Sequence, residues 1–523
     1  MIYRSPFPDV DIATMSLPVF VLEHADRRSG KAALIDGPTG HTLTYAQLAG
    51  AIKRTATGLA ARGFTKGDVF AIYSPNLPEY AVAFFGIAAA GGISTTINPT
   101  YTATELRRQL QDSSARYLVT IPQFLDTARE AITETVVEEI FVFGDGKGAT
   151  PFATLMVEGN TPVVQIDPRE DLVALPYSSG TTGLPKGVML THYNIVANLT
   201  QINGVEQTAD TEVLIGILPF YHIYGMVAIM CSALRVGATV VTMPRFDLDQ
   251  FLGLIPRYGI TTGYLVPPIV LALAKHPAVD HYDLSTLNDI MSGAAPLPES
   301  VATACASRNN LVVRQGYGLT ETSPVTHINP RTSALKVASV GTPLPNTEHR
   351  IVDLATMKDA PQGELGEVWI RGPQVMKGYL HNQEATRDMI DEEGWLHSGD
   401  IGRTDGDGYL YVVDRVKELI KYKGLQVAPA ELEAVLQSHP AVADVAVIPS
   451  PDEEAGEVPK AFVVVKPETT LTADEVIAFV AERVSPQKKV RKVEFIDAIP
   501  KVPSGKILRR TLVERERASV GGR

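Results

Sequence analysis

Helical and strand-like patterns alternate along most of the chain, and this alternation limits the possible folds more than any other feature. Thr44 and Gln47 form a capping box ahead of an apolar helical stripe that stops at Gly63. A strand-like run at 69–73 follows, and a strongly apolar helix begins at about Glu79. The pattern predicts an α/β protein whose parallel sheets are covered by helices.

The chain is too long, at 523 residues, to form a single hydrophobic core. After Lys417 the remaining residues contain a complete small α+β set of their own, with an amphipathic helix predicted at 429–436. We therefore expect a large N-terminal domain of several subdomains at 1–416. A small, mobile α+β domain is expected at 417–523.

The composition is that of an ordinary globular protein, with 45% hydrophobic and 20% charged residues. Cys231 and Cys305 are too few for a disulfide framework, which favours a reducing compartment. The first residues lack the basic start and apolar run of a signal peptide, so we expect a cytoplasmic protein. The longest apolar run, 81–93, is shorter than the roughly 20 residues of a membrane helix. It predicts a buried helix and no stable membrane insertion.

The formal net charge of −12 argues against nonspecific binding to nucleic acid. The charge is uneven, because residues 417–523 carry 17 basic and 16 acidic side chains. This comparatively basic tail is either a solvated face or a surface that meets phosphates.

The most informative local motif is SerSerGlyThrThrGlyLeuProLysGly at 178–187, directly after a strand-like run. Its glycines let backbone N–H groups converge on an anion, its hydroxyls add donors, and Lys186 adds a positive charge. It differs from the common loop GxxxxGK[ST], because Pro185 stands where the second glycine is expected. The motif predicts a phosphate-binding loop in preference to a simple turn.

Three further clusters are individually weaker. GlnGlyTyrGlyLeuThrGlu at 315–321 offers an aromatic face for a base and a carboxylate, Glu321, suited to Mg²⁺. Asp400 follows a turn in TrpLeuHisSerGlyAsp, where it is suited to accept hydrogen bonds from ribose hydroxyls. ProSerGlyLys places Lys506 on a turn near the end of the chain. Alone, each cluster also fits a structural turn or a surface position.

Taken in this order over nearly the whole chain, these motifs resemble the adenylate-forming superfamily of acyl-CoA synthetases, firefly-type luciferases and peptide-synthetase adenylation domains. The segments 219–225, 292–297 and 418–433 are most similar to its 4-coumarate-CoA ligase branch. The resemblance implies a large domain that binds ATP and a carboxylic acid, and a small domain that swings between two poses. It further implies CoA and Mg²⁺, in a monomer or homodimer.

The resemblance also assigns roles residue by residue. Lys506 is implied to bridge the carboxylate and the α-phosphate during adenylation, where a fixed cation offsets developing charge. The nucleotide contacts are implied for Ser178, Ser179, Gly180, Thr181, Thr182, Lys186, Gln315, Gly316, Tyr317, Thr320, Asp400 and Arg415, with Glu321 as the metal ligand. The thioester step is implied for the hinge Lys417, the catalytic residues Lys421 and Gln426, and the CoA contacts Arg245, Lys423 and Gly424.

His222, a lone histidine beside aromatic residues, would ordinarily be a packed core residue. Its match to the family motif makes it a gate or a carboxylate-orienting group. The acid pocket implied by the resemblance is mostly apolar and comprises Ile223, Tyr224, Val227, Met291, Gly293, Ala294, Gly316, Gly318, Pro324 and Val325.

The pocket sequence narrows the choice of acid. Residues 219–230 contain no Asp or Glu to pair with the ammonium of an amino acid, which disfavours a peptide-synthetase role. Met291 stands where plant hydroxycinnamate ligases resemble one another in carrying a lysine. This departure admits cinnamate or a medium-chain fatty acid beside 4-coumarate. A luciferase-like oxidase and a nucleotide-binding protein without catalysis are the remaining alternatives.

Overall fold

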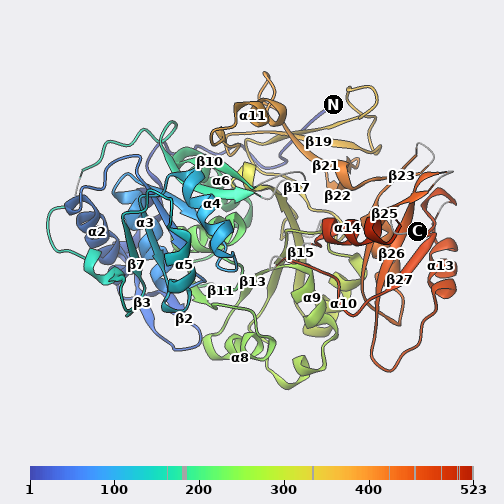
Figure 1. Ribbon diagram of the computed structural model, residues 1–523, viewed down its shortest axis with the longest axis horizontal. Helices are drawn as coiled ribbons and strands as arrows, with labels where there is room; N and C mark the ends of the chain where they lie inside the picture. Colours follow the sequence, from blue (N-terminus) through green and yellow to red (C-terminus); the bar gives the residue numbers. More distant parts are fainter. Residues whose placement is uncertain are drawn as a thin grey trace.

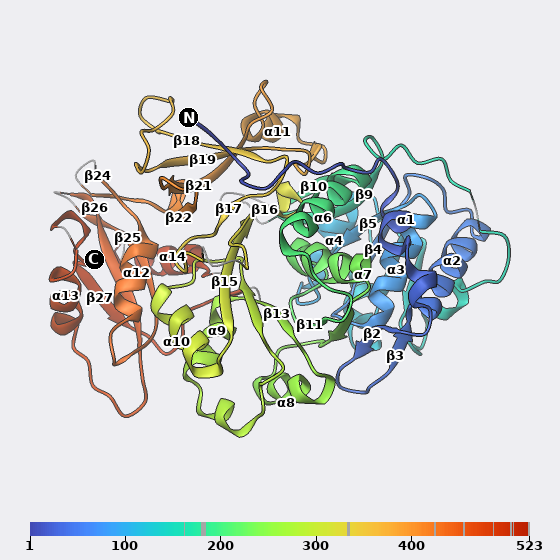
Figure 2. The same cartoon turned by 180° about the vertical axis from the view of Figure 1, so that it is seen from behind.

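Four β-sheets form the framework of the part of the chain that the structure describes (Figure 1). The computed structural model describes residues 1–161, 163–178, 185–331, 335–422, 425–452, 455–484, 486–502, 505 and 507–520. Figures 1 and 2, seen from opposite sides, both place the C-terminal sheet at the end of the molecule away from α2 (Tyr45–Ala61).

The first sheet has eight strands in the order β20-β10-β9-β5-β4-β6-β7-β8. It is parallel from β9 to β8, whereas β9, β10 and β20 pair antiparallel. Its strands are β4 (Val69–Tyr73), β5 (Ile93–Thr96), β6 (Tyr117–Thr120), β7 (Glu139–Val142), β8 (Thr150–Pro151), β9 (Leu172–Ser178), β10 (Lys186–Thr191) and β20 (Gly378–Tyr379).

The second sheet has nine strands in the order β17-β16-β15-β14-β13-β11-β12-β2-β3. The six strands from β15 to β2 are joined by five parallel pairings, and antiparallel strands close both ends of the sheet. Its strands are β2 (Ala32–Asp36), β3 (Thr42–Thr44), β11 (Val213–Gly216), β12 (Thr239–Thr242), β13 (Thr262–Leu265), β14 (Asp289–Ser292), β15 (Val312–Gly318), β16 (Val325–Ile328) and β17 (Thr342–Pro343).

Helices cover these two sheets, as the sequence predicts. Helix α2 begins with the expected Thr44–Gln47 capping box, and Gly63 follows its end with φ +73°. Helix α3 (Pro78–Ala89) is almost entirely buried and packs on α2, so the apolar run is a core helix. The other helices are α1 (Leu17–Leu22), α4 (Ala103–Ser113), α5 (Leu125–Ala131), α6 (His192–Glu206), α7 (Ser232–Val236), α8 (Leu248–Tyr258), α9 (Pro267–Lys275) and α10 (Glu299–Asn309).

The third sheet differs from the parallel sheets that the sequence suggests. Its order is β1-β18-β19-β21-β22, and every pairing is antiparallel. Antiparallel strands need no crossover helix, and from β18 to β22 the short α11 (Gln383–Met389) is the one helix between strands of this sheet. The strands are β1 (Ile2–Arg4), β18 (Glu348–Val352), β19 (Gly366–Arg371), β21 (Leu396–Thr404) and β22 (Leu410–Arg415).

The C-terminal part contains the fourth sheet and helices of its own. The path β24-β23-β26-β25 is antiparallel, and β27 pairs parallel with β26. Val445, Val463 and Val480 are among the buried residues of its separate hydrophobic core. Its elements are β23 (Ile420–Tyr422), β24 (Leu425–Val427), α12 (Pro429–Gln437), β25 (Val442–Asp452), β26 (Gly456–Val465), α13 (Ala473–Ala481), β27 (Lys492–Phe495) and α14 (Arg509–Val520).

Among the described helices, none combines the length and the apolar character that a membrane span requires.

Candidate active site

The expected phosphate loop connects two antiparallel strands at the edge of the first sheet. Ser178, the last residue of β9, is opposite Lys186, the first residue of β10. Ser179, Gly180, Thr181 and Thr182 lie outside the described residues. The Lys186 ammonium lies 4.8 Å from the centre of the Tyr379 ring, on the neighbouring strand β20. The edge pairing thus fixes the lysine beside an aromatic ring.

Tyr379 joins Lys186 to the expected metal ligand. Its hydroxyl donates to Glu321 Oε1 at 2.8 Å, and the Met376 N–H donates to the Glu321 carbonyl at 2.8 Å. Burial, reinforced by Glu321, raises the pKa of the Tyr379 hydroxyl, which therefore stays protonated. Sequence reasoning missed Tyr379, because its role depends on a strand pairing across nearly 200 residues of sequence.

The surroundings of Glu321 fit Mg²⁺ held jointly with phosphates. The carboxylate is 7% exposed and lies in the short turn Thr320–Thr322 after β15. Within the described ranges, no group of three or more His, Cys, Asp or Glu is arranged to hold a metal on its own. One carboxylate with substrate phosphates is a common protein contribution to a magnesium site. Glu321 would therefore supply one oxygen ligand, and the nucleotide and water the others.

The expected ribose contacts come together between the second and third sheets. Asp400 on β21 faces Arg415 on β22, and Arg415 Nε lies 3.0 Å from Asp400 Oδ1. The Tyr317 hydroxyl, from the end of β15, donates to Asp400 Oδ2 at 2.6 Å. Burial and the Asp400 charge raise the pKa of Tyr317, which keeps it a donor. Residues more than 80 apart in sequence thus form one hydrogen-bonded group.

Gln315 has a structural function in this arrangement. Its side-chain nitrogen donates to the carbonyls of Leu297 and Val337 at 3.3 and 2.8 Å, and its oxygen accepts from the Leu297 N–H. The side chain therefore holds two loops together. Because its amide oxygen and nitrogen are already bonded to Leu297 and Val337, the Gln315 side chain is less suited to the direct adenylate contact expected from the sequence.

Several of the predicted acid-pocket residues, called the acid slot below, lie close together. The Tyr224 hydroxyl donates to the Met291 carbonyl at 3.1 Å, and a Cβ on Gly293 would come within 3.0 Å of the Tyr224 ring. A Cβ on Gly316 would lie 3.3 Å from Met291 Sδ. The Tyr224 ring also meets Tyr264, with the two ring centres 6.2 Å apart. Tyr264 is a second residue near the predicted site, after Tyr379, that no sequence motif identifies.

The remaining pocket residues lie at a π-helix and at the β15–β16 connection. The π-helix, a rare element often found at functional sites, spans residues 224–231; Val227 is buried within it and Ile223 just before it. At the β15–β16 connection, Pro324 and Val325 are buried beyond Gly318. Ala294 is exposed, and Thr320 begins the turn that carries Glu321. His222 lies just before the π-helix, where its Nδ1 accepts from the Tyr224 N–H at 3.3 Å.

The residues expected to act in the thioester step are only partly described. Arg245 is exposed after β12, and Lys421 is exposed on β23. Lys423, Gly424 and Lys506 lie outside the described residues, as do the side chains of Lys417 and Gln426. Gly505 is described, and a Cβ there would come within 2.9 Å of Pro268 Cδ on α9. Gly505, the neighbour of Lys506 in the sequence, therefore lies against α9.

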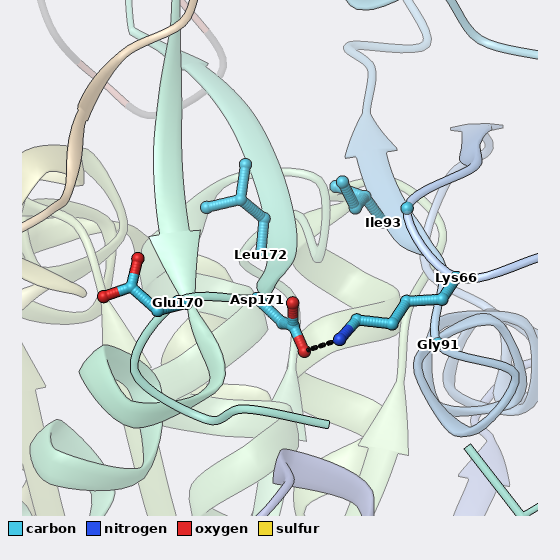
Figure 3. A pocket seen from close by; sticks show the side chains of 7 residues that line it. Lys66, Gly91, Ile93, Glu170, Asp171 and Leu172 are labelled. Atoms are coloured by element: carbon cyan, nitrogen blue, oxygen red, sulfur yellow. Dashed lines mark ion pairs between the residues drawn. The ribbon is translucent and has the colours of Figure 1, made fainter. Parts of the chain in front are cut away.

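A separate cavity of about 360 Å³ opens where β4, β5 and β9 begin (Figure 3). Figure 3 shows Lys66 and Asp171 directed toward each other, with 2.6 Å between the Lys66 nitrogen and Asp171 Oδ2. Ligands of parallel sheets bind beyond the carboxyl ends of the strands, whereas this cavity is at the amino ends. It is therefore distinct from the site around Lys186 and Glu321.

The chain belongs to the family of AMP-binding enzymes. Residues 21–380 match the family described as AMP-binding enzyme, and residues 431–506 match the AMP-binding enzyme C-terminal domain. Among similar curated proteins is 4-coumarate--CoA ligase 2 of Petroselinum crispum, 45% identical over 98% of this chain and 96% of that protein. 4-Coumarate--CoA ligase 1 of Solanum tuberosum is 43% identical over 99% of this chain and 97% of that protein.

Solved structures agree with this family. The anthranilate CoA ligase AuaEII in complex with anthranoyl-AMP has a TM-score of 0.90 and 27% identity, covering 98% of this chain and 99% of that one. ATP-bound MatB from Rhodopseudomonas palustris has a TM-score of 0.88 and 28% identity, covering 96% of this chain and 99% of that one.

Proposed function

We propose that the chain is an ATP-dependent carboxylic acid:CoA ligase. The acid carboxylate attacks the ATP α-phosphate to form an acyl-adenylate and pyrophosphate, and the CoA thiol then displaces AMP to give the acyl-CoA. The observation that carries this proposal is the convergence of the Lys186–Tyr379–Glu321 group and the Tyr317–Asp400–Arg415 group. Two of the predicted acid-pocket residues, Gly316 and Gly318, flank Tyr317 on β15. The residues proposed to bind the phosphates, the ribose and the acid therefore lie next to one another.

Each residue of the site has a separate proposed role in adenylation. Lys186 and the hydroxyl-rich loop 178–182 hold the triphosphate, and Glu321 supplies an oxygen to Mg²⁺, which neutralises phosphate charge when bound. Asp400 accepts from the ribose hydroxyls and is held in place by Arg415. Lys506 approaches from the tail to offset the charge that develops on the α-phosphate.

The proposed acid is an aryl acid of the 4-coumarate or cinnamate type. Two aromatic rings, Tyr224 and Tyr264, lie at the predicted acid pocket and offer faces on which an aryl ring could pack. Beneath Tyr224 and Tyr264, Arg314 pairs with Glu206 and Asp289 at 2.7 Å. Arg331 lies a further 3.3 Å from Asp289 and 3.7 Å from Glu206, so the two carboxylates face two guanidinium groups and do not favour a substrate ammonium. A medium-chain fatty acid is the alternative, because Met291 makes the slot more apolar.

The test is product analysis with ATP, Mg²⁺, CoA and a mixture of cinnamate, 4-coumarate and octanoate. We expect AMP, pyrophosphate and an aryl-CoA thioester, identified by mass spectrometry. Preferential octanoyl-CoA would support the fatty-acid alternative and overturn the aryl assignment. Failure of every member of a broad acid panel to support exchange between pyrophosphate and ATP would overturn the ligase proposal itself.

The second half-reaction is proposed to use the tail in another pose. In this proposal the small domain, 417–523, rotates about Lys417 and presents Lys421, Lys423, Gly424 and Gln426 to the adenylate. Arg245 then meets a CoA phosphate. We also propose a cytoplasmic location and a monomer or homodimer, which light scattering of the purified protein would distinguish.

A further inference from the structure

Helix α12 of the C-terminal part begins without a cap of its own. Its N-cap residue is Ala428, which has no side-chain acceptor, whereas α13 of the same C-terminal part is capped by Thr472 in a complete capping box. The first N–H groups of a helix need acceptors, and alanine is a poor residue at that position. The cap of α12 must therefore come from elsewhere.

Asp414 supplies it from the far side of the expected hinge. Its Oδ2 accepts from the Ala430 N–H, at the second position of α12, at 2.8 Å, and its Oδ1 accepts from the Arg415 N–H at 2.7 Å. Asp414 belongs to β22, where it pairs with Ile401 of the third sheet. The carboxylate is thus built into the large domain and caps a helix of the small one.

Two further contacts accompany this bond. Ile401 on the large side packs with Leu419 and Ala428 on the small side in one apolar cluster. Gly505, next to Lys506, lies against Pro268. In the arrangement in which Asp414 caps α12, Gly505 of the small domain therefore contacts α9 of the large one.

We propose that Asp414 is a positioning residue that holds the small domain in the adenylation pose by capping α12 across the hinge, and that this cap breaks when the domain rotates for thioester formation. The proposal rests on the ligase function proposed above. Asp414 touches neither substrate nor the reacting atoms. It acts through the placement of Lys506 and of Arg415, whose N–H it binds.

Burial and the charged groups around Asp414 set its pKa, and so the pH range over which the capped pose loses stability. Arg509 on α14 approaches it and is itself paired with Glu418 and Glu433 at 2.6 Å. Burial raises the pKa of Asp414 from 3.8 to about 7, against the Arg509 charge and the two N–H donors, and Glu433 adds to the rise. The carboxyl thus ionises near neutral pH.

The sign of the pH effect follows from this raised pKa. A pose that exposes Asp414 to water would lose the proton near its ordinary pKa, whereas the pose shown retains it to about pH 7. The capped pose is therefore most favoured below about pH 4, is weakened as the pH rises to about 7, and changes no further above that value.

The first test is Asp414→Ala in the full-length protein, with the two half-reactions measured separately. At pH 8, where Asp414 is ionised and accepts its hydrogen bonds as a carboxylate, we expect acid-dependent pyrophosphate exchange to fall about tenfold. Thioester formation from preformed acyl-adenylate should be unchanged or faster. An equal loss in both half-reactions would overturn the proposal.

The matched control restores the cap locally. Asp414→Ala combined with Ala428→Ser gives α12 a cap within its own domain. We expect the double variant to regain thermal stability while its pyrophosphate exchange remains low. If exchange returns with stability, Asp414 is only a helix cap and the proposal fails.

A direct measurement of the pose separates this proposal from the proposed function. Cys231 and Cys305 are buried, so Val136→Cys and Glu514→Cys, at two exposed positions, would carry a fluorescence pair. As the pH rises from 5 to 7, within the window given above, we expect the distance distribution to shift away from the capped pose. It should be independent of pH in Asp414→Ala. A pH-independent distribution in the parent protein would contradict the proposal whatever the enzyme assays show.

Discussion

Tyr379 links the predicted triphosphate and metal contacts through one side chain. Its ring faces the Lys186 ammonium and its hydroxyl binds Glu321. The two contacts separate experimentally, because phenylalanine keeps the ring and removes the hydroxyl.

We predict that Tyr379→Phe raises the Mg²⁺ concentration needed for half-maximal pyrophosphate exchange about tenfold, the usual effect of a lost hydrogen bond to a charged group. The carboxylate of Glu321 would then be less well oriented toward the metal. Tyr379→Leu, which also removes the ring, should raise the ATP requirement as well. Identical kinetics for the parent and Tyr379→Phe would show that the hydroxyl does not orient Glu321.

For single residues, the sequence predicts which side chains belong to the candidate site better than it predicts which side chains contact one another. Tyr317, Asp400 and Arg415 are all expected at the nucleotide from the sequence, and they lie within one hydrogen-bonded group. Tyr379 and Tyr264 were missed, because their contacts arise from strand pairing and ring packing between distant segments. No local pattern in the sequence records such contacts.

The β15–β16 connection carries Gly318, Pro324 and Val325 of the predicted acid slot and is closely packed. A Cβ at Gly318 would come within 2.0 Å of the Pro324 carbonyl oxygen, a distance that backbone atoms cannot relieve by a rotamer change. In contrast, a Cβ at Gly263 on β13 would meet only the flexible Leu265 side chain, at 3.3 Å or more.

We predict that Gly318→Ala forces the connection apart, lowering the midpoint of thermal unfolding and reducing adenylation at least tenfold by displacing the slot. Gly263→Ala is the matched control and should retain most activity. Thermal scans and pyrophosphate exchange test both variants. If the two substitutions have the same effect, close packing at Gly318 is not what shapes the slot.

Elements with a strong local signal were predicted well. The Thr44–Gln47 box and Gly63 set the ends of α2, and the run at 69–73 is β4. The antiparallel third sheet and the π-helix at 224–231 were not predicted, since strand direction and an extra residue in a helical turn depend on tertiary packing.

At the scale of the whole molecule, several buried histidines must remain neutral for the fold to persist. Burial lowers the pKa of His192 to about 4 and that of His349 to about 3, and it also lowers the pKa of His327. His192 accepts the Leu17 N–H through Nδ1 at 3.0 Å, which ties the N-terminal segment to α6. Protonation of this nitrogen would abolish that bond.

The sign of the resulting pH dependence is fixed. An unfolded histidine takes up a proton near pH 6.5, whereas folded His192 does so only near pH 4. Its contribution to stability is therefore complete above pH 6.5 and is lost as the pH falls toward 4, by up to about 1.4 kcal/mol per pH unit. We predict that His192→Asn, whose side-chain oxygen can still accept the Leu17 N–H, weakens this dependence. Denaturant unfolding of parent and variant at pH 7.5, 6.5 and 5.5 measures the difference, and parallel pH profiles would exclude His192 as a source of acid instability.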